Sequence, residues 1–430
     1  MMLHIGTAKV NITPSRPVPL GGFASRLGLG GFQGISHPLY ARIVCFGHSD
    51  AGGKSTSAIL VSADLLWWGS QLVEGLKQRI RALWHADTVI LHGTHSHSGP
   101  QIWDGFSEYG GSIDLAYIAE LETTVLQGVE AAMSDMEPVT VDIGRGVCDI
   151  ATNRRSAADD GIRIASNSNG PVDRELTVLR YNSAPGGRTK AVLVHYACHP
   201  VVTSDNLISS EFTGVAMEEL EQSIGDGAIC AYLQGSCGDI NPHDGDMGGD
   251  AQVVMLGCRL ANDVNKVLAG AMRRVDSVGL RSMRMSVALP LQALPERDYL
   301  ESQSGEPGVM GEWSRKLLSR QEGLPTSMSL EMTGLVLAEG FAVLAMNAEV
   351  VVAYGLYLKS ASNKAVVPLT YSDGMIGYIP TARQLEEGGY EPIDSTYYFG
   401  LPAPFAPEAE GILREALDVV VREFCDAKQS

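Results

Sequence analysis

The stretch Thr88–Pro100 reads TVILHGTHSHSGP and joins an apolar run to a pair of histidines. The residues from Thr88 to His92 are typical of a buried strand. The strand ends in a loop of small residues, and such loops are where rigid scaffolds present functional side chains. His95 and His97 stand two positions apart, so both point to the same side of an extended segment. The stretch therefore predicts a strand that opens into a functional pocket.

Strand-like runs alternate with helical periodicity along the chain, which indicates an α/β fold. The expected strands are Ala58–Ala63, Thr88–His92, Ala191–Tyr196 and Ala228–Leu233. The expected helices are Gln71–Trp84, Ala116–Met133, Gly214–Ser223 and Ala251–Ala271. Farther on, Ser327–Ala348 is typical of a hairpin that turns at Glu339 and Gly340, and a helix is expected from about Val350 to Ser360. We predict an α/β fold with a mixed sheet and flanking helices.

The domain organisation follows from length and from the loops. With 430 residues, 45% of them hydrophobic, the chain can bury a substantial core. Three loops are rich in glycine and serine, but none is long or polar enough to link independent domains. These loops are Gly21–Gly34, Ala157–Gly170 and Asp244–Gly249. We expect residues 1–430 to form a single catalytic domain.

Charge and hydropathy restrict the classes of partner. The formal net charge of −18 argues against nucleic acid and against an anionic membrane surface as partners, because both would repel the protein. No apolar run reaches the length of a membrane-spanning helix, so no stable membrane insertion is expected. The N-terminus lacks the basic start and apolar core of a signal peptide, which predicts a cytoplasmic protein. The oligomeric state stays open.

A further histidine follows a second expected strand. His199 comes after Ala191–Tyr196, and Pro200 ends that strand. If the two strands are neighbours in the sheet, His199 lies beside His95 and His97. Imidazoles held at rigid positions are preferred zinc ligands. The alternative is that these histidines only hydrogen-bond backbone carbonyls, but the two motifs together favour a metal site.

Two histidines inside the expected strands have a different interpretation. His92 and His195 are expected to be core histidines rather than ligands. Two other segments supply polar groups near strand ends. LQGSCGDINP, Leu233–Pro242, offers Asp239 and Asn241, with an ordinary turn as the alternative. TNRRSAADDG, Thr152–Gly161, places Arg154 and Arg155 beside a loop, where spacing alone favours plain surface charges.

The motif HSHSGP, His95–Pro100, resembles the HTHSGP motif of the neutral/alkaline ceramidase family. Members of that family are zinc amidases that release a fatty acid from an N-acyl sphingoid base. Other family motifs are matched in the family's order over nearly all of the chain. They correspond to Gly6–Pro14, Asn153–Arg155, Gly170–Glu175, His199–Pro200, Gly238–Pro242, Ala348–Glu349, Tyr378–Thr381 and Tyr390–Glu391.

The resemblance implies a zinc ion and its ligands. Carried over position by position, the ligands are His95, His199, Glu349 and Tyr378. Two neutral imidazoles and one carboxylate leave net positive charge on the ion, which can lower the pKa of its water to about 7. Spacing alone would instead make Glu349 a carboxylate at a helix N-terminus and Tyr378 a boundary residue.

The resemblance also implies residues that face the substrate. His97 and Tyr390 are expected to donate to the developing oxyanion, which contributes roughly 3 kcal/mol per donor. Arg154 is expected to hydrogen-bond substrate oxygens or the leaving carboxylate, whereas Arg155 has no family counterpart. The family serine of the GDxSP motif is Asn241 here, which excludes a serine acyl-enzyme at that position but leaves metal-hydroxide attack intact.

The remaining departures concern the ends and the substrate. Secreted relatives carry a C-terminal immunoglobulin-like domain and a signal peptide, and we expect this chain to lack both. We predict a zinc-dependent amidohydrolase that cleaves a linear N-acyl amide, either ceramide-like and lipid-like or a smaller soluble amide. The alternatives are a metal-dependent esterase or lactonase, and a non-catalytic binding protein braced by zinc. An open coordination position would distinguish a catalytic from a structural site.

Overall fold

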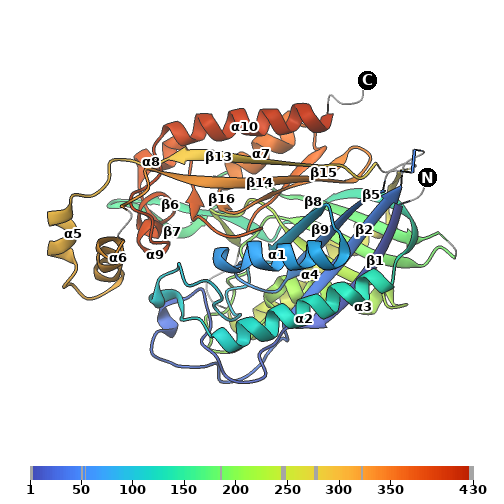
Figure 1. Cartoon of the computed structure of the whole chain (residues 1–430), viewed down its shortest axis with the longest axis horizontal. Coiled ribbons are helices and arrows are strands. Elements are labelled where there is room, and N and C mark those ends of the chain that lie inside the picture. The colour runs from blue at the N-terminus through green and yellow to red at the C-terminus, as the bar shows by residue number, and fades with distance from the viewer. Residues whose placement is uncertain are drawn as a thin grey trace.

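Two stacked β-sheets covered by helices on their outer sides form the body of the protein (Figure 1). The structure is a computed structural model, and it describes residues 3–49, 52–53, 55–184, 186–243, 248–275, 279–320 and 323–425. The predicted α/β fold with a mixed sheet and flanking helices is confirmed. The hairpin predicted at Ser327–Ala348 builds a second sheet that stacks on the first.

Among the described residues, nine strands form the larger sheet, eight of them in the order β10-β9-β8-β5-β1-β2-β3-β4, with β12 paired to β5. The pairs β3–β4 and β9–β10 are parallel and the other pairs are antiparallel. The strands are β1 (Leu3–Asn11), β2 (Tyr40–Ser49), β3 (Ser55–Ala63), β4 (Thr88–Gly93), β5 (Glu137–Val147), β8 (Glu175–Ser183), β9 (Thr189–Tyr196), β10 (Ile229–Gln234) and β12 (Arg273–Val275).

The smaller stacked sheet has the order β13-β14-β15-β17. Its strands are β13 (Ser282–Pro290), β14 (Ser327–Ala338), β15 (Phe341–Met346) and β17 (Val366–Leu369). The β14–β15 hairpin turns at Glu339 and Gly340 as predicted, and Gly340 has a φ of 72°, a conformation that glycine adopts without strain. The predicted hairpin therefore supplies the two central strands of this sheet.

Alternation along the strands fills both faces of each sheet. In β9, Val192 and Val194 pack in the cluster that contains the helices α3 and α4, whereas Leu193 packs against the smaller sheet. In β15, Leu344 faces the outer helices and Val343 faces the larger sheet. The main helices are α1 (Ser70–Trp84), α2 (Leu115–Ser134), α3 (Glu211–Ile224), α4 (Gly249–Ala269), α7 (Val352–Ala361) and α10 (Glu408–Cys425).

The outer helices complete the layers. Helices α1 and α2 lie on the outer side of the larger sheet, and α10 runs along the smaller sheet (Figure 1). Shorter helices are η1 (Ala24–Arg26), η2 (Glu108–Gly110), α5 (Arg297–Gln303), α6 (Val309–Leu318), α8 (Ala382–Glu387), η3 (Tyr390–Asp394) and α9 (Ser395–Tyr398). No helix in the described part of the chain combines the length and apolar character needed to cross a membrane.

Two small sheets complete the topology near the strand ends. One has the order β11-β6-β7, and the other pairs β16 with β18. Their strands are β6 (Ala151–Ala158), β7 (Gly161–Asn167), β11 (Ile240–Pro242), β16 (Glu349–Val350) and β18 (Tyr378–Ile379). The prediction of a loop at Ala157–Gly170 is wrong, because β7 occupies its centre. In the loop expected at Asp244–Gly249, residues 244–247 lie outside the described residues.

The larger sheet curls so that its two edge strands approach each other. β4 lies at one edge and β10 at the other. At their ends, the backbone N–H of Gln234 donates to His92 Nε2 across 3.0 Å. Ser62 in β3 likewise donates to the carbonyl of Tyr232 in β10, at 2.7 Å. β4 and β9 are therefore not neighbours, so the condition under which their histidines were expected to meet is not fulfilled, and curling of the sheet brings the histidine loops together instead.

Candidate metal centre

Three imidazoles converge beyond the ends of β4 and β9. The ligating nitrogens of His95, His97 and His199 all lie within 4.8 Å of one another. His95 and His199 are fully buried, whereas His97 is half-buried. The two loops that carry them were both singled out by the sequence. The structure brings these loops together as the prediction requires.

Backbone carbonyls fix the orientation of the two buried rings. His95 Nδ1 lies 2.9 Å from the carbonyl of Leu66, and His199 Nδ1 lies 2.6 Å from that of Cys237. A carbonyl only accepts, so each Nδ1 carries the proton and each Nε2 presents a lone pair. This arrangement is typical of metal-binding histidines, whose second ring nitrogen donates to a fixed acceptor.

Both lone pairs face the carboxylate of Glu349. Its Oε2 lies 3.4 Å from His95 Nε2 and 3.4 Å from His199 Nε2. Within the described residues this buried Oε2 accepts no hydrogen bond. A buried carboxylate oxygen without a donor is unfavourable, and a cation would satisfy it. Two imidazole nitrogens and a carboxylate oxygen converging in this way fit a divalent ion such as zinc.

Protonation states also suit a cation. Burial lowers the pKa of His199 to about 4, and burial together with the neighbouring imidazoles holds the pKa of His97 well below its usual range. Burial acts to raise the pKa of Glu349, but His95 and His199 outweigh it and lower that pKa. These pKa shifts favour a neutral His97, a neutral His199 and an ionised Glu349, the forms that bind metal.

Tyr378 lies beside Glu349 because the two are register partners in the β16–β18 pair. Its side chain is buried, and its hydroxyl accepts a hydrogen bond from Arg154 Nη2 at 3.0 Å. Burial raises the pKa of Tyr378, although Arg154 acts in the opposite direction. The structure thus places the fourth predicted ligand in the same buried region as the other three.

Arg154 connects several of these groups. Its Nη1 lies 3.5 Å from His199 Nε2 and donates to Asn241 Oδ1 at 3.2 Å. Its Nε donates to Glu391 at 2.8 Å. Arg155 donates to the other oxygen of Glu391 at 2.6 Å. The interpretation of Arg154 and Arg155 as surface charges is wrong, because both are buried in β6 and pair with the carboxylate of Glu391, and Arg155 also pairs with Glu387 at 3.3 Å.

The two predicted oxyanion donors are more exposed than Arg154, the third residue predicted to contact the substrate. His97 and Tyr390 are half-buried, in contrast to the buried side chains around them. His97 Nδ1 lies 3.2 Å from the carbonyl of Gly22, and its Nε2 lies 3.1 Å from His95 Nε2. The Tyr390 ring packs edge-on against Tyr378, with centroids 5.6 Å apart. Burial raises the pKa of Tyr390, so its hydroxyl stays protonated and can donate.

The segment Leu233–Pro242 is more than an ordinary turn. Asp239 accepts from the backbone N–H of Val352 at the start of α7, and it also accepts from Asn153 and Gln384. Asp239 is therefore a structural carboxylate, whereas Asn241 touches Arg154. His92 and His195 are fully buried inside their strands and hydrogen-bonded there, which confirms them as core histidines.

Residues that the sequence did not single out surround His95. Tyr371 stacks on the His95 ring with centroids 3.9 Å apart. Trp67 lies on another side, with centroids 5.9 Å apart, and packs against Phe106 and Phe399. The pair Trp67–Trp68 shortly after β3 was a usable signal, because tryptophans seldom follow a strand without a packing role. Tyr371 carries no such signal in the sequence.

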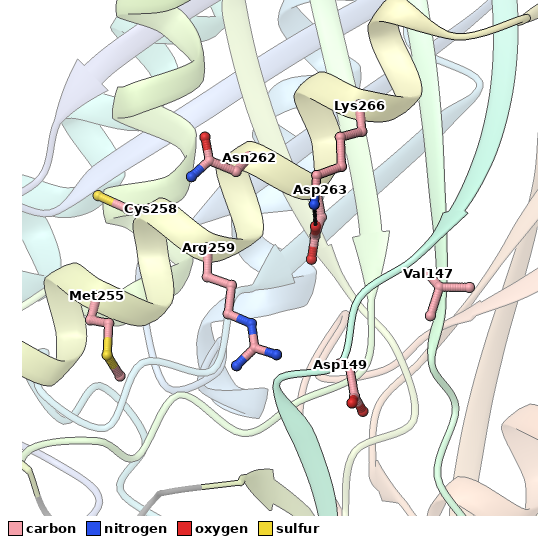
Figure 2. Close-up of a pocket in the computed structure, with 8 residues that line it drawn as sticks. All are labelled: Val147, Asp149, Met255, Cys258, Arg259, Asn262, Asp263 and Lys266. Carbon is pink, nitrogen blue, oxygen red and sulfur yellow. Dashed lines mark hydrogen bonds and ion pairs between the residues drawn. The ribbon is translucent and has the colours of Figure 1, made fainter.

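A separate surface hollow of about 510 Å³ lies between α4 and the link from β5 to β6 (Figure 2). Its lining includes Arg259 on the helix and Asp149 opposite. The ammonium of Lys266 pairs with Asp263 on the helix itself, at 2.7 Å. The lining contains none of the three clustered histidines. This hollow is therefore separate from the histidine centre.

Comparison with known proteins gives a family match over the first part of the chain. Residues 3–266 match the family described as neutral/alkaline non-lysosomal ceramidase, N-terminal. The chain is similar to neutral ceramidase of Pseudomonas aeruginosa, with 25% identity over 182 residues, 39% of this chain and 26% of that protein. It is also similar to neutral ceramidase B of Dictyostelium discoideum, with 27% identity over 267 residues, 56% of this chain and 35% of that protein.

The fold has a solved counterpart. The crystal structure of neutral ceramidase from Pseudomonas aeruginosa superposes with a TM-score of 0.76 at 17% identity, covering 99% of this chain and 75% of that one. At this identity the likeness establishes the shared fold. The sequence matches span about a quarter to a third of the length of the two curated relatives.

Proposed function

The chain belongs to the neutral/alkaline non-lysosomal ceramidase family, and from this premise we propose that it is a zinc-dependent amidohydrolase acting on a linear N-acyl amide. The observation that carries the proposal is the convergence of His95 Nε2 and His199 Nε2 on the unpartnered Oε2 of Glu349. Tyr378 is the fourth proposed ligand. When bound, zinc would supply a Lewis acid and a hydroxide nucleophile at neutral pH.

His97 is proposed to handle the proton of the reaction. Because its Nδ1 proton points to the Gly22 carbonyl, its Nε2 first offers a lone pair rather than a donor. Nε2 can therefore accept a proton from the attacking water. Once protonated, it can donate to the developing oxyanion and pass the proton to the leaving amine nitrogen. This order refines the expectation that His97 acts as an oxyanion donor from the start.

Tyr390 and Arg154 are proposed to hold the substrate. The protonated hydroxyl of Tyr390 suits donation to the carbonyl oxygen of the scissile amide. Arg154 is anchored by Glu391, which keeps its guanidinium beside His199 and Tyr378. From this position it can hydrogen-bond a substrate oxygen or the carboxylate product.

The aromatic side chains beside His95 support an apolar substrate. Trp67, Phe106 and Phe399 pack together, and the Trp67 ring reaches the His95 ring. In the described part of the chain, the buried Trp67 indole N–H has no hydrogen-bond acceptor. We propose that an acyl or alkyl chain of the substrate lies beside these buried rings and that a substrate oxygen accepts a hydrogen bond from the indole N–H. The proposed substrate is therefore a lipid-like N-acyl amine.

The proposal is tested by metal analysis and a substrate panel. Purified protein is expected to bind about one equivalent of zinc and to hydrolyse N-acyl amines of varied chain length. His95→Ala and His199→Ala should lose both the zinc and the activity, while His243→Ala, which replaces a partly exposed histidine, should keep both. Full zinc occupancy in His95→Ala and His199→Ala would remove them from the ligand set.

The panel also separates the alternatives. It includes an ester matched to each amide in chain length. Cleavage of the esters with no cleavage of the amides would indicate an esterase. Bound zinc with no turnover of any substrate would indicate a binding protein.

A further inference from the structure

Gln234 lies at the end of β10, between the two histidine loops. Its side-chain Nε2 donates to the carbonyl of Thr94 at 3.2 Å and to the carbonyl of Cys198 at 2.9 Å. Thr94 directly precedes His95, and Cys198 directly precedes His199. One amide group thus touches the peptide unit in front of each buried histidine.

The Gln234 amide is completely satisfied. Its Oε1 accepts from the backbone N–H of Cys198 at 3.2 Å, and it lies 3.3 Å from the hydroxyl of Tyr232, whose single proton also faces the carbonyl of Tyr196 at 3.1 Å. Both N–H groups face carbonyls and the oxygen faces the backbone N–H of Cys198, so only one orientation of the amide fits. Gln234 is fully buried, where such a network is held rigidly.

The network joins segments that are not paired as strands in the described sheet, and it adds to one backbone hydrogen bond between the two loops, from the N–H of His97 to the carbonyl of Pro200 at 3.3 Å. β4 and β10 are the two edges of the larger sheet, and β9 pairs with β8 and β10 but not with β4 in the described sheet. The spacing of His95 and His199 therefore depends on contacts across the curled sheet. His95 also has a φ of 72°, an unfavourable conformation for a non-glycine residue that needs support from its surroundings.

We propose that Gln234 is the positioning residue that sets the separation between His95 and His199 in the metal centre. It acts on these ligands through the carbonyls of Thr94 and Cys198 and touches neither substrate nor metal. The inference rests on the proposed function in taking His95 and His199 as ligands. It adds a residue whose role is geometric: without the bridge, the two loops keep their histidines and the hydrogen bond from His97 N–H to the Pro200 carbonyl, but fewer contacts hold their spacing.

The test compares Gln234→Met with a matched control. Methionine has a similar length and removes the hydrogen bonds of the amide. The control is Gln384→Met, because Gln384 is also buried and also uses both ends of its amide, with Thr381 and Asp239, but bridges no histidine loops. The readouts are the zinc dissociation constant from chelator competition, the visible absorption spectrum of the Co²⁺ form, and the thermal midpoint.

We expect Gln234→Met to bind zinc roughly 10- to 100-fold more weakly than the wild type, the usual effect of losing a partner that orients a ligand. Its Co²⁺ spectrum should change, because the spectrum reports ligand geometry. Gln384→Met should lower the thermal midpoint while leaving zinc affinity and spectrum unchanged. Equal zinc affinity and spectra for Gln234→Met and the wild type would overturn the positioning role.

Two further outcomes are decisive. If Gln234→Met does not fold, Gln234→Glu is used, which keeps the shape and one oxygen but turns an acceptor toward the two carbonyls. Failure of both variants to fold would assign Gln234 to folding and reject the positioning role. Failure of the wild type to bind zinc would contradict the proposed function, and this inference with it, whereas wild-type binding with unaltered variants would contradict the inference alone.

Discussion

Glu349 and Tyr378 face each other as register partners in a parallel pair of two-residue strands, β16 and β18. Register partners in neighbouring strands project to the same side of a sheet. The pairing therefore presents a carboxylate and a phenol together, although they come from separate segments of the chain. Both side chains are buried, and the Tyr378 hydroxyl is held by Arg154. Their contributions to metal binding should nevertheless differ.

We predict that Glu349→Gln weakens zinc binding much more than Tyr378→Phe does. The carboxylate supplies the negative charge of the centre, whereas the phenol is a neutral and weaker donor. Tyr378→Phe should lose no more than about tenfold in zinc affinity, and Glu349→Gln about 100-fold or more. Chelator competition measures both constants. A larger loss in Tyr378→Phe would show that the phenol is a principal ligand.

His97 provides a test that separates metal binding from catalysis. His97→Ala should keep its zinc but lower kcat by roughly two to three powers of ten, because it loses the group that moves the proton and stabilises the oxyanion. Zinc content and kcat are measured on the same preparation. Loss of zinc would instead make His97 a ligand, a role that its closeness to His95 and His199 also allows.

Part of the site was predictable because its residues lie in local motifs. HSHSGP and His199–Pro200 can be recognised as short motifs, and the resemblance to the neutral/alkaline ceramidase family pointed to Glu349 and Tyr378. The way in which His95 approaches His199 was not predictable, however. Neighbouring strands were one condition that would bring them together, whereas the strands lie far apart in the sheet order and meet through its curl. Sheet curvature is a long-range property that periodicity does not encode.

The residues that support the histidine centre could not be predicted from the sequence for the same reason. Gln234 and Tyr371 act through partners far away in the chain, such as Cys198 and His95. Arg155 seemed to be a surface charge because its partner Glu391 lies far along the chain. Buried ion pairs of this kind depend on which distant segments meet, and a single sequence shows neither partner's location.

His195 should make the protein less stable in acid. Burial lowers its pKa from 6.5 to about 3. The unfolded chain therefore takes up a proton that the folded protein excludes, so the stability contribution is complete above pH 6.5 and is lost as the pH falls toward 3. Over this range the slope reaches about 1.4 kcal/mol per pH unit for this one group.

The variant His195→Gln tests this assignment. Its amide can still donate to the carbonyl of Pro368, the partner of His195 Nε2 at 2.8 Å, but it cannot titrate. Urea unfolding between about pH 7 and about pH 4 should show a shallower loss of stability in the variant by about one proton. Equal slopes in the two proteins would assign the acid sensitivity to other groups.

Trp67 should determine the preference for long apolar substrates. Trp67→Ala removes the ring that lies between His95 and Phe106, so it should raise KM for long acyl chains more than for short ones and leave zinc content unchanged. The control is Trp84→Ala, which removes a half-buried tryptophan at the end of α1. An equal change of KM for all chain lengths would show that Trp67 does not contact the acyl chain of the substrate.

A substitution at Asn241 distinguishes attack by a zinc-bound hydroxide from attack by a serine side chain. Its Oδ1 accepts from Arg154 Nη1 at 3.2 Å, so it positions the guanidinium and offers no nucleophilic oxygen. If zinc supplies the nucleophile, the natural protein should already hydrolyse an N-acyl amide. Asn241→Ser should then change the rate only modestly, because the shorter serine weakens the contact with Arg154 while the proposed ligands stay in place.

The measurement compares the hydrolysis rates of the natural protein and of Asn241→Ser at equal zinc loading across the substrate panel. Activity that appears only in the serine form would contradict the zinc-hydroxide proposal, because it would make a covalent serine necessary.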